Sequence, residues 1–223
     1  MVFSRSPEPG KVKTRLIPVL GVQGALSLYQ AMLTSVLELC ATLDSREVGF
    51  KEEDCNTVGC NTELWIQGDL NNPFILQTAQ RFAFPLRQQQ GNNLGESMAD
   101  AFGQALKNYH KVIVIGGDCV SLDALYFKNA FAALTEHDVV IGPAEDGGYV
   151  LLGFRASPQL TAVYSKIFQE IEWGKADVYQ HTRAQIAAVS LSYHVLDTRW
   201  DVDSADDLKK IRHHPRFSHV FIK

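Results

Sequence analysis

The chain has 223 residues, a net charge of −4 at pH 7 and an ordinary globular balance of 46% hydrophobic and 21% charged residues, which predicts one domain over 1–223. This charge gives no sign of a nucleic-acid-binding protein, and no run of about 18 apolar residues predicts a membrane span. Charge and proline follow Met1 too soon for a signal peptide, and four cysteines are too few for a disulfide framework, so we expect free thiols in a cytoplasmic protein.

Strand and helix signals alternate from the start of the chain. Residues 1–3 are expected to form the stub of a strand, and a loop rich in proline, glycine and basic residues follows over 4–18. Apolar residues at helical spacing predict an amphipathic helix over 22–43. The polar residues 44–62 are interpreted as a loop or an insertion.

The alternation continues to the C-terminal region. The expected elements are strands at 63–67, 86–90, 111–115, 138–141, 149–154 and 193–196, and helices at 72–83, 94–109, 122–136, 177–190 and 205–212. The run from Val112 to Ile115 is unbroken and apolar, which is typical of a strand covered on both faces. The tail 215–223 is expected to be an edge strand or disordered. This pattern predicts a doubly wound, mostly parallel sheet with ligands outside the carboxyl ends of its strands.

A basic loop follows the first expected strand. In it, four basic residues are opposed by Glu8 alone. The four are Arg5, Lys11, Lys13 and Arg15. Arginine forks and lysine point charges suit phosphate oxygens, and proline and glycine can hold loop amides exposed. We interpret the segment as a phosphate-binding loop, with a solvated basic loop as the alternative; the P-loop pattern GxxxxGK[ST] is absent.

Carboxylates follow two of the strands that are expected to be buried. Asp118, in the string GGDC, could ligate a hard divalent cation that bridges phosphates, although a helix cap or a turn would also explain it. Glu145 and Asp146, in the string EDGG, could act as a base or orient an acceptor hydroxyl. A charged β-turn is the alternative for this pair.

Two further segments carry polar residues at expected strand ends. Asp201 and Asp203 alternate on an extended segment and so share a face, and one of them could complete a cation site with Asp118. Helix capping explains the residues from Ser204 to Asp207 but not this pair. The string QQQGNNLGE over 88–96 could read the edge of a nucleobase through amides and bare glycine backbone, or could be an ordinary polar turn.

Five strings, taken in order, resemble the motifs of the DUF2064 family, also called the rSAM/selenodomain-associated transferase family, within the glycosyltransferase-A superfamily. They are FSRSPEPGKVKTRL, QGNNLGESM, GGDC, GPAEDGGYVLLG and DVDSADDL. The resemblance covers about residues 3–210, and the first and fourth strings are the most specific. It implies a three-layer α/β/α sandwich with a mixed, mostly parallel sheet of about seven strands, and a reaction on a nucleotide donor that depends on Mg²⁺ or Mn²⁺.

The resemblance also implies roles by position. It places Arg5, Lys11, Lys13 and Arg15 in the phosphate loop, Gln90, Gly91 and Gly95 in the base-contact loop, Asp118 and Asp203 at the metal, and Glu145 and Asp146 on the acceptor side. Val120 departs from the family, which usually has proline there. The family also has several more residues before Phe3, so we expect a chain that begins a few residues late.

These features together predict a metal-dependent transferase that uses a nucleotide-activated small-molecule donor and a small acceptor. The leading hypothesis is glycosyl transfer from a nucleoside-diphosphate sugar, with the cation and the basic loop neutralising the leaving diphosphate. A nucleotidylyltransferase that releases pyrophosphate is the second hypothesis. A non-catalytic nucleotide-binding protein on the same fold is the third.

Overall fold

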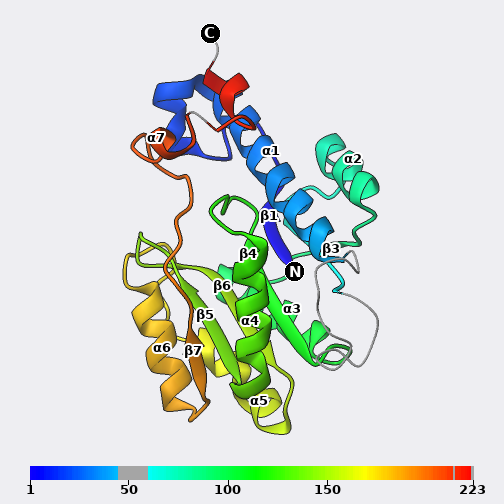
Figure 1. Ribbon diagram of the computed structural model, residues 1–223, viewed down its shortest axis with the longest axis vertical. Helices are drawn as coiled ribbons and strands as arrows, with labels where there is room; N and C mark the ends of the chain where they lie inside the picture. The colour runs from blue at the N-terminus through cyan, green and yellow to red at the C-terminus, as the bar shows by residue number, and fades with distance from the viewer. Residues whose placement is uncertain (45–59, 213, 222–223) are drawn as a thin grey trace.

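Seven strands form one sheet in the order β3-β2-β1-β4-β6-β5-β7, in a computed structural model that describes residues 1–44, 60–212 and 214–221 (Figure 1). The strands are β1 (Val2–Arg5), β2 (Leu64–Gln67), β3 (Leu86–Gln88), β4 (Lys111–Gly116), β5 (Val139–Pro143), β6 (Tyr149–Arg155) and β7 (Tyr193–Val195). Strand β6 runs antiparallel to both of its neighbours, and the other described pairs are parallel. The expected seven-stranded, mostly parallel mixed sheet is therefore confirmed. Most of the insertion expected at 44–62 lies outside the described residues.

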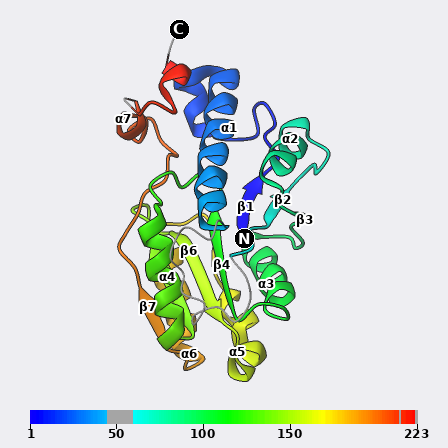
Figure 2. The ribbon, with the colours of Figure 1, turned by 45° about the vertical axis from the view of Figure 1, so that its right-hand side comes forward.

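Helices cover both faces of this sheet (Figures 1 and 2). The helices are α1 (Ile17–Asp44), α2 (Pro73–Phe82), α3 (Leu94–Ala105), α4 (Ala124–Glu136), α5 (Pro158–Val163), α6 (Val178–Ala188) and α7 (Leu208–Ile211), with 3₁₀ turns at Thr14–Leu16, Tyr164–Phe168 and Ser218–Phe221. Helices α1, α2 and α4 share one apolar cluster with Ile113 and Ile115 of β4. Helices α3, α5 and α6 share another with Val112 and Val114. Strand β4 is thus apolar on both faces because both faces are covered.

Helix α1 begins earlier than the expected residue 22 and bends at Gly21, where φ is 72° and ψ is 169°. Among the described residues, the stretch Thr14–Leu43 has the length and mean hydropathy, 1.4, that a membrane span would need. Its Leu28, Leu33 and Leu37 side chains are nevertheless fully buried in the apolar clusters. A core helix of a folded domain passes the same test of length and composition, and a third of the apolar window of α1 is buried.

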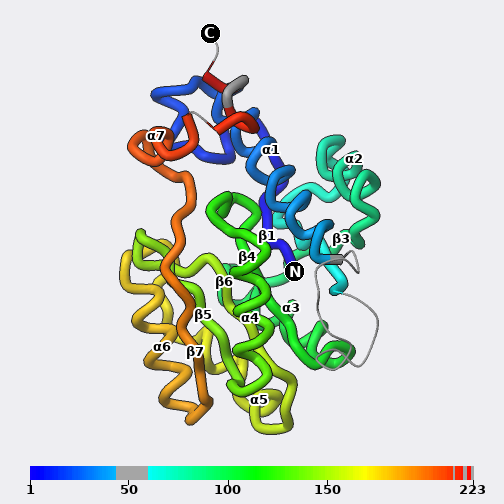
Figure 3. Tube along the Cα trace, viewed as in Figure 1, coloured from blue at the N-terminus to red at the C-terminus, as the bar shows by residue number. Residues whose placement is uncertain are grey.

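The C-terminal half contains two features that the sequence did not predict. Helix α5 and the 3₁₀ turn after it, together Pro158–Phe168, were not expected, because these short elements lack several turns of helical periodicity. In the tail, Ser218–Phe221 form a 3₁₀ turn beside the start of α1 and not the edge strand that was one of the two expectations (Figure 3). Phe217 is buried, and Arg216 lies 2.7 Å from Glu38 of α1. These contacts join distant parts of the chain and leave no local signal.

Strand β1 lies inside the sheet, between β2 and β4, and extends two residues beyond the expected stub 1–3. The main chain of Met1 continues the ladder, because its amino group donates to Ile113 O at 2.7 Å and its carbonyl accepts from Ile115 N at 3.1 Å. At the other end of β1, the Tyr29 hydroxyl of α1 accepts from Arg5 N at 2.8 Å. The basic loop therefore leaves the sheet from a fixed point.

Candidate functional site

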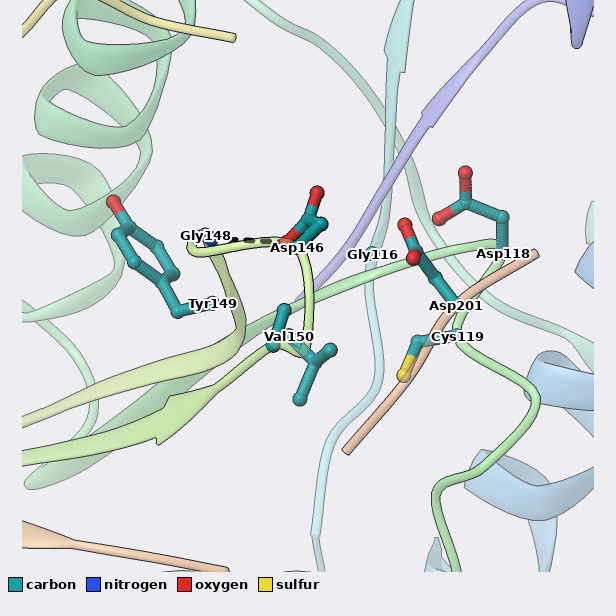
Figure 4. A pocket seen from close by; sticks show the side chains of 9 residues that line it. Gly116, Asp118, Cys119, Asp146, Gly148, Tyr149, Val150 and Asp201 are labelled. Atoms are coloured by element: carbon teal, nitrogen blue, oxygen red, sulfur yellow. Dashed lines mark hydrogen bonds between the residues drawn. The ribbon is translucent and has the colours of Figure 1, made fainter. Parts of the chain in front are cut away.

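A pocket of about 100 Å³ lies at the edge of the sheet where β4 and β5 end and where β6, which lies between them, begins. It is lined by Gly116, Asp118, Cys119, Ala144, Asp146, Gly148, Tyr149, Val150 and Asp201. Figure 4 shows the Asp201 side chain between those of Asp146 and Asp118, although the three come from different segments of the chain. The rule that ligands gather at the carboxyl ends of parallel strands thus leads to an acidic pocket.

Lys13 of the basic loop is paired with the acids beside this pocket. Its Nζ lies 2.8 Å from Asp118 Oδ2 and 3.5 Å from Asp203 Oδ1, and its side chain is only 5% exposed. Burial alone would lower the pKa of Lys13, but the attraction of Asp118 and Asp203 raises it above its usual value. Burial likewise opposes ionisation of Asp118, yet Lys13 holds the pKa of that carboxyl below its usual value. Both charges therefore persist at neutral pH.

The backbone of Lys13 is strained. Its φ of 44° and ψ of 45° place it in the left-handed region, which residues other than glycine rarely enter and which costs on the order of 1 kcal/mol. The Lys13 carbonyl accepts from Leu16 N at 2.9 Å and so starts the 3₁₀ turn that leads into α1. The fold keeps this conformation, and it aims the ammonium group at the end of β4.

The other three basic residues of the loop differ in their partners. Arg15 Nη1 lies 2.6 Å from Asp203 Oδ2, whereas Lys11 Nζ pairs with Glu8 at 2.6 Å in the exposed part of the loop. Arg5 is exposed, and no ion pair to it is found among the described residues, but its charge helps to lower the pKa of Asp118. The loop is therefore partly neutralised by the protein's own acids.

Asp201, rather than Asp203, completes the lining of the pocket. Burial raises the pKa of Asp201 to about 6, and the nearby charges of Asp118, Asp146 and Asp203 add to this rise while Lys13 opposes it. Asp203 instead faces the basic loop. The alternation of Asp201 and Asp203 indicated that both were of interest, but it did not show which one would enter the pocket.

The segment that carries Asp201 is held to the sheet edge by its main chain. Leu196 N donates to Ile141 O and Arg199 N donates to Pro143 O, each at 2.9 Å, so the segment follows β5 beyond its end. Trp200, the residue after Arg199, is bound to Ser121, which lies three residues after Asp118. The Ser121 hydroxyl donates to the Trp200 carbonyl and accepts from Trp200 N at 3.1 Å. These bonds bring Asp201 close to Asp118, although the two are 83 positions apart in the sequence.

The two carboxylates of the EDGG string, Glu145 and Asp146, lie in different surroundings. Asp146 lines the pocket, and its Oδ1 also accepts from Gly148 N at 2.9 Å, so the residue belongs both to the pocket and to the turn. Glu145 Oε2 instead pairs with Lys210 Nζ at 2.6 Å, and Glu145 is not among the lining residues. The turn geometry therefore brings only one of the two into the pocket.

The expected base-contact loop lies outside the lining of the acidic pocket. Gln90 is exposed, while its neighbour Gln89 is used in the fold, with Nε2 donating to Trp65 O at 2.9 Å. Gly91 has a φ of 122°. Gly95 is buried beneath the indole of Trp173, and a Cβ atom there would lie 2.7 Å from that ring. The sequence did not predict this contact of Trp173, because no local pattern links Trp173 to Gly95.

Among the described residues, no group of three or more His, Cys, Asp or Glu side chains is arranged to hold a metal ion. Asp118 and Asp203 do share a cation, but that cation is the Lys13 ammonium group. Carboxylate oxygens are the right donors for Mg²⁺ or Mn²⁺, and Mg²⁺ in nucleotide sites is commonly bound by one or two carboxylates plus phosphates. The residues thus fit an ion that donor phosphates complete, and they do not form a protein-only cage.

Comparison with known proteins agrees with this architecture. Residues 53–175, more than half of the chain, match the family described as "Uncharacterized protein conserved in bacteria (DUF2064)", and the chain belongs to that family. A crystal structure of a "putative nucleotide-diphospho-sugar transferase" from Desulfovibrio desulfuricans G20 is 29% identical, with a TM-score of 0.76 over 97% of this chain and 90% of that one. No curated protein sequence matches the chain.

More distant structures share the fold. A 4-diphosphocytidyl-2C-methyl-D-erythritol synthase from Anaerococcus prevotii DSM 20548 is 13% identical, with a TM-score of 0.57 over 94% of each chain. An inositol-1-phosphate CTP transferase from T. maritima is also 13% identical, with a TM-score of 0.53 over 98% of this chain and 95% of that one. The expected fold class, that of glycosyltransferase-A and nucleotidyltransferase proteins, is therefore confirmed.

Proposed function

We propose that this protein is a metal-dependent transferase that acts on a nucleotide-activated donor, with glycosyl transfer from a nucleoside-diphosphate sugar to a small acceptor as the leading reaction. One observation carries the proposal: a basic loop and an acidic pocket meet at the carboxyl edge of the sheet, joined by Lys13 and Asp118. A diphosphate and its cation need these two surfaces side by side. The similarity to the Desulfovibrio protein supports the same reaction class.

The loop would receive the donor diphosphate. Arg5 and Lys11 are exposed and can turn toward phosphate oxygens, and Arg15 pairs with Asp203. Asp118 and Asp203 would hold Mg²⁺ or Mn²⁺, with Asp201 facing the same pocket. When bound, the ion would supply positive charge against the leaving diphosphate. The arginine and lysine side chains would add charge at the same oxygens.

The acceptor would approach from the side of Asp146. This carboxylate lines the pocket and is fixed by its bond from Gly148 N, so it can accept a hydrogen bond from, or a proton of, an acceptor hydroxyl. Glu145, which was expected to share this role, is held by Lys210 outside the lining. We therefore assign the acceptor role to Asp146 and a structural role to Glu145.

Nucleotidyl transfer from a nucleoside triphosphate is the second candidate. The observation in its favour is the fold shared with the Anaerococcus synthase and the T. maritima CTP transferase, each 13% identical to this chain. Both reactions would use the same loop and cation, but their products differ. Glycosyl transfer releases a nucleoside diphosphate, and nucleotidyl transfer releases pyrophosphate.

Product analysis tests the proposal. The purified protein is incubated with Mn²⁺, a mixture of small acceptors, and either a panel of nucleoside-diphosphate sugars or the four nucleoside triphosphates. Nucleoside diphosphate that accumulates with one sugar donor, and is lost in Asp118→Asn but not in the exposed surface variant Asp206→Asn, would support glycosyl transfer. Pyrophosphate release would favour the second candidate. Binding of nucleotides without either product would indicate a non-catalytic nucleotide-binding protein.

A further inference from the structure

The Lys13 ammonium group occupies the place between two carboxylates that a shared divalent cation would need. It lies 2.8 Å from Asp118 Oδ2 and 3.5 Å from Asp203 Oδ1 and is almost fully buried. Lys11, two residues earlier in the same loop, is 72% exposed and pairs with Glu8 away from the pocket. The position of Lys13 is thus a specific feature of one residue and does not follow from the general charge of the loop.

We propose that Lys13 is a built-in counter-ion: it holds the cation position in the ligand-free protein and yields it to the divalent cation when a nucleotide diphosphate binds. The inference rests on the proposed function and adds an order of events to it. In the free protein, Mg²⁺ or Mn²⁺ would have to displace an ammonium group from Asp118 and Asp203. Binding of the ion alone is therefore weak.

The surroundings explain why an internal cation is needed. Asp118 is only half-buried, with 32% of its side chain exposed, but Asp201 and Asp146 line the same pocket, so the acids would repel one another without a positive charge among them. A lysine suits this task because its long, flexible stem can carry a point charge to a new partner. The neighbouring Arg15 also forms an ion pair with Asp203, at 2.6 Å.

A diphosphate supplies the new partner. Its oxygens would attract Lys13 away from Asp118 and would at the same time complete the coordination of the incoming ion. Relief of the strain in the left-handed backbone of Lys13 would also favour rearrangement of the loop once the ion pair is released. Nucleotide and divalent cation should therefore bind cooperatively, and each should raise the affinity for the other by the same factor.

Mn²⁺ binding followed by electron paramagnetic resonance tests the proposal without an activity assay. We compare the wild type, Lys13→Met and Lys11→Met in the absence of nucleotide. Lys13→Met should bind Mn²⁺ at least tenfold more tightly than the wild type, while Lys11→Met should match the wild type. Equal or weaker Mn²⁺ binding by folded Lys13→Met would overturn the proposal.

Thermal unfolding provides a second readout that does not require a stable variant. Lys13→Met and the more polar Lys13→Gln should melt below the wild type in EDTA, because the clustered acids lose their counter-ion. Mn²⁺ should raise the melting temperature of both variants more than that of the wild type, since the ion takes the vacated place. A melting temperature that Mn²⁺ leaves unchanged in both variants would also overturn the proposal.

The nucleotide arm separates this inference from the proposed function. With a panel of ADP, CDP, GDP and UDP, at least one should raise the Mn²⁺ affinity of the wild type tenfold or more, and should do so less in Lys13→Met. If a nucleotide promotes Mn²⁺ binding equally in both proteins, the counter-ion role is wrong while the proposed function stands. If neither protein binds Mn²⁺ with any nucleotide, both proposals fail.

Discussion

The carbonyl group of Ala176 lies directly against Gly147, so that a Cβ atom on Gly147 would come within 2.5 Å of the carbonyl carbon and 2.9 Å of the Ala176 Cα. Gly147 also has a φ of 90°, and its carbonyl accepts from Tyr179 N in α6 at 2.9 Å. The turn that carries Asp146 is thus clamped to the loop before α6. The second half of the EDGG string is therefore fixed by close packing as well as by turn geometry.

This clamp predicts that Gly147→Ala is severely destabilising, and Gly174 offers a matched control. Gly174 has a nearly equal φ of 86°, but nothing lies within 4 Å of its Cβ position. Gly174→Ala should lower the free energy of unfolding by about 1 kcal/mol, the strain of a left-handed alanine. Gly147→Ala should lower it by about 3 kcal/mol or more, because backbone atoms must also move. Urea unfolding measures both, and equal losses would contradict the clamp.

Asp201 gives a prediction about pH. Its pKa of about 6 lies above the ordinary 3.8, so ionisation of Asp201 destabilises the folded protein as the pH rises from about 4 to about 6, and the penalty is constant above that. Asp201→Asn removes this penalty. The variant should exceed the wild type in free energy of unfolding by about 1–3 kcal/mol at pH 7.5, and the difference should vanish near pH 4.

Chemical denaturation across pH 4–8 checks this difference, with the exposed Asp206→Asn as the control that should follow the wild type throughout. The turnover of Asp201→Asn should fall although its stability rises, since Asp201 faces the proposed cation and donor. Stability curves for Asp201→Asn and the wild type that stay parallel over the whole range would show that the crowding of acids around Asp201 is not felt in solution.

The sequence predicted the sheet well because most of its strands have a recognisable local pattern of apolar residues. The run from Val112 to Ile115 is apolar on both faces, and Asp118 and Asp146 follow strand ends, so their arrival at one edge could be expected. The choice between Asp201 and Asp203 could not be made in this way. Both follow β7, and which of them enters the pocket depends on bonds to distant residues such as Ser121.

The contact between Lys13 and Asp118 also could not be predicted from the sequence. Four basic residues in one loop look alike, and only the left-handed conformation of Lys13 sends its side chain inward. Glu145 and Asp146 present the same difficulty, because adjacent residues in a turn point in different directions. The residue types in a site can thus be read from local patterns, while the pairing among them is set by loop conformation and by long-range contacts.

The difference between Arg5 and Lys11 predicts unequal roles in nucleotide binding. Lys11 already pairs with Glu8, whereas no acid is paired with Arg5 among the described residues. Arg5→Ala should therefore weaken binding of a nucleoside diphosphate about tenfold, or about 1.4 kcal/mol, and Lys11→Ala should weaken it less. Calorimetric titration at two salt concentrations measures this, and the loss in Arg5→Ala should shrink at high salt. Equal affinity of Arg5→Ala and the wild type would mean that Arg5 is a solvated surface residue that does not contact the nucleotide.

The packing of Trp173 on Gly95 predicts an energetic coupling between these two residues. A Cβ atom on Gly95 would lie 2.7–2.9 Å from three indole atoms, so Gly95→Ala should lower the free energy of unfolding by about 2 kcal/mol. In a Trp173→Ala background the obstruction is gone, and alanine is the better helix former, so the same change should be neutral or stabilising by up to about 1 kcal/mol. The double-mutant cycle should therefore give a coupling of about 2–3 kcal/mol.

Urea unfolding of the four proteins measures this coupling, and additive losses would mean that the indole moves aside without strain. Nucleotide affinity read on the same four proteins separates two roles of Gly95. If Gly95 serves only to admit the indole, Gly95→Ala should change affinity in the wild-type background and not in Trp173→Ala. If bare backbone at Gly95 also approaches the nucleobase, as the family resemblance implies, the methyl group should weaken binding in both backgrounds.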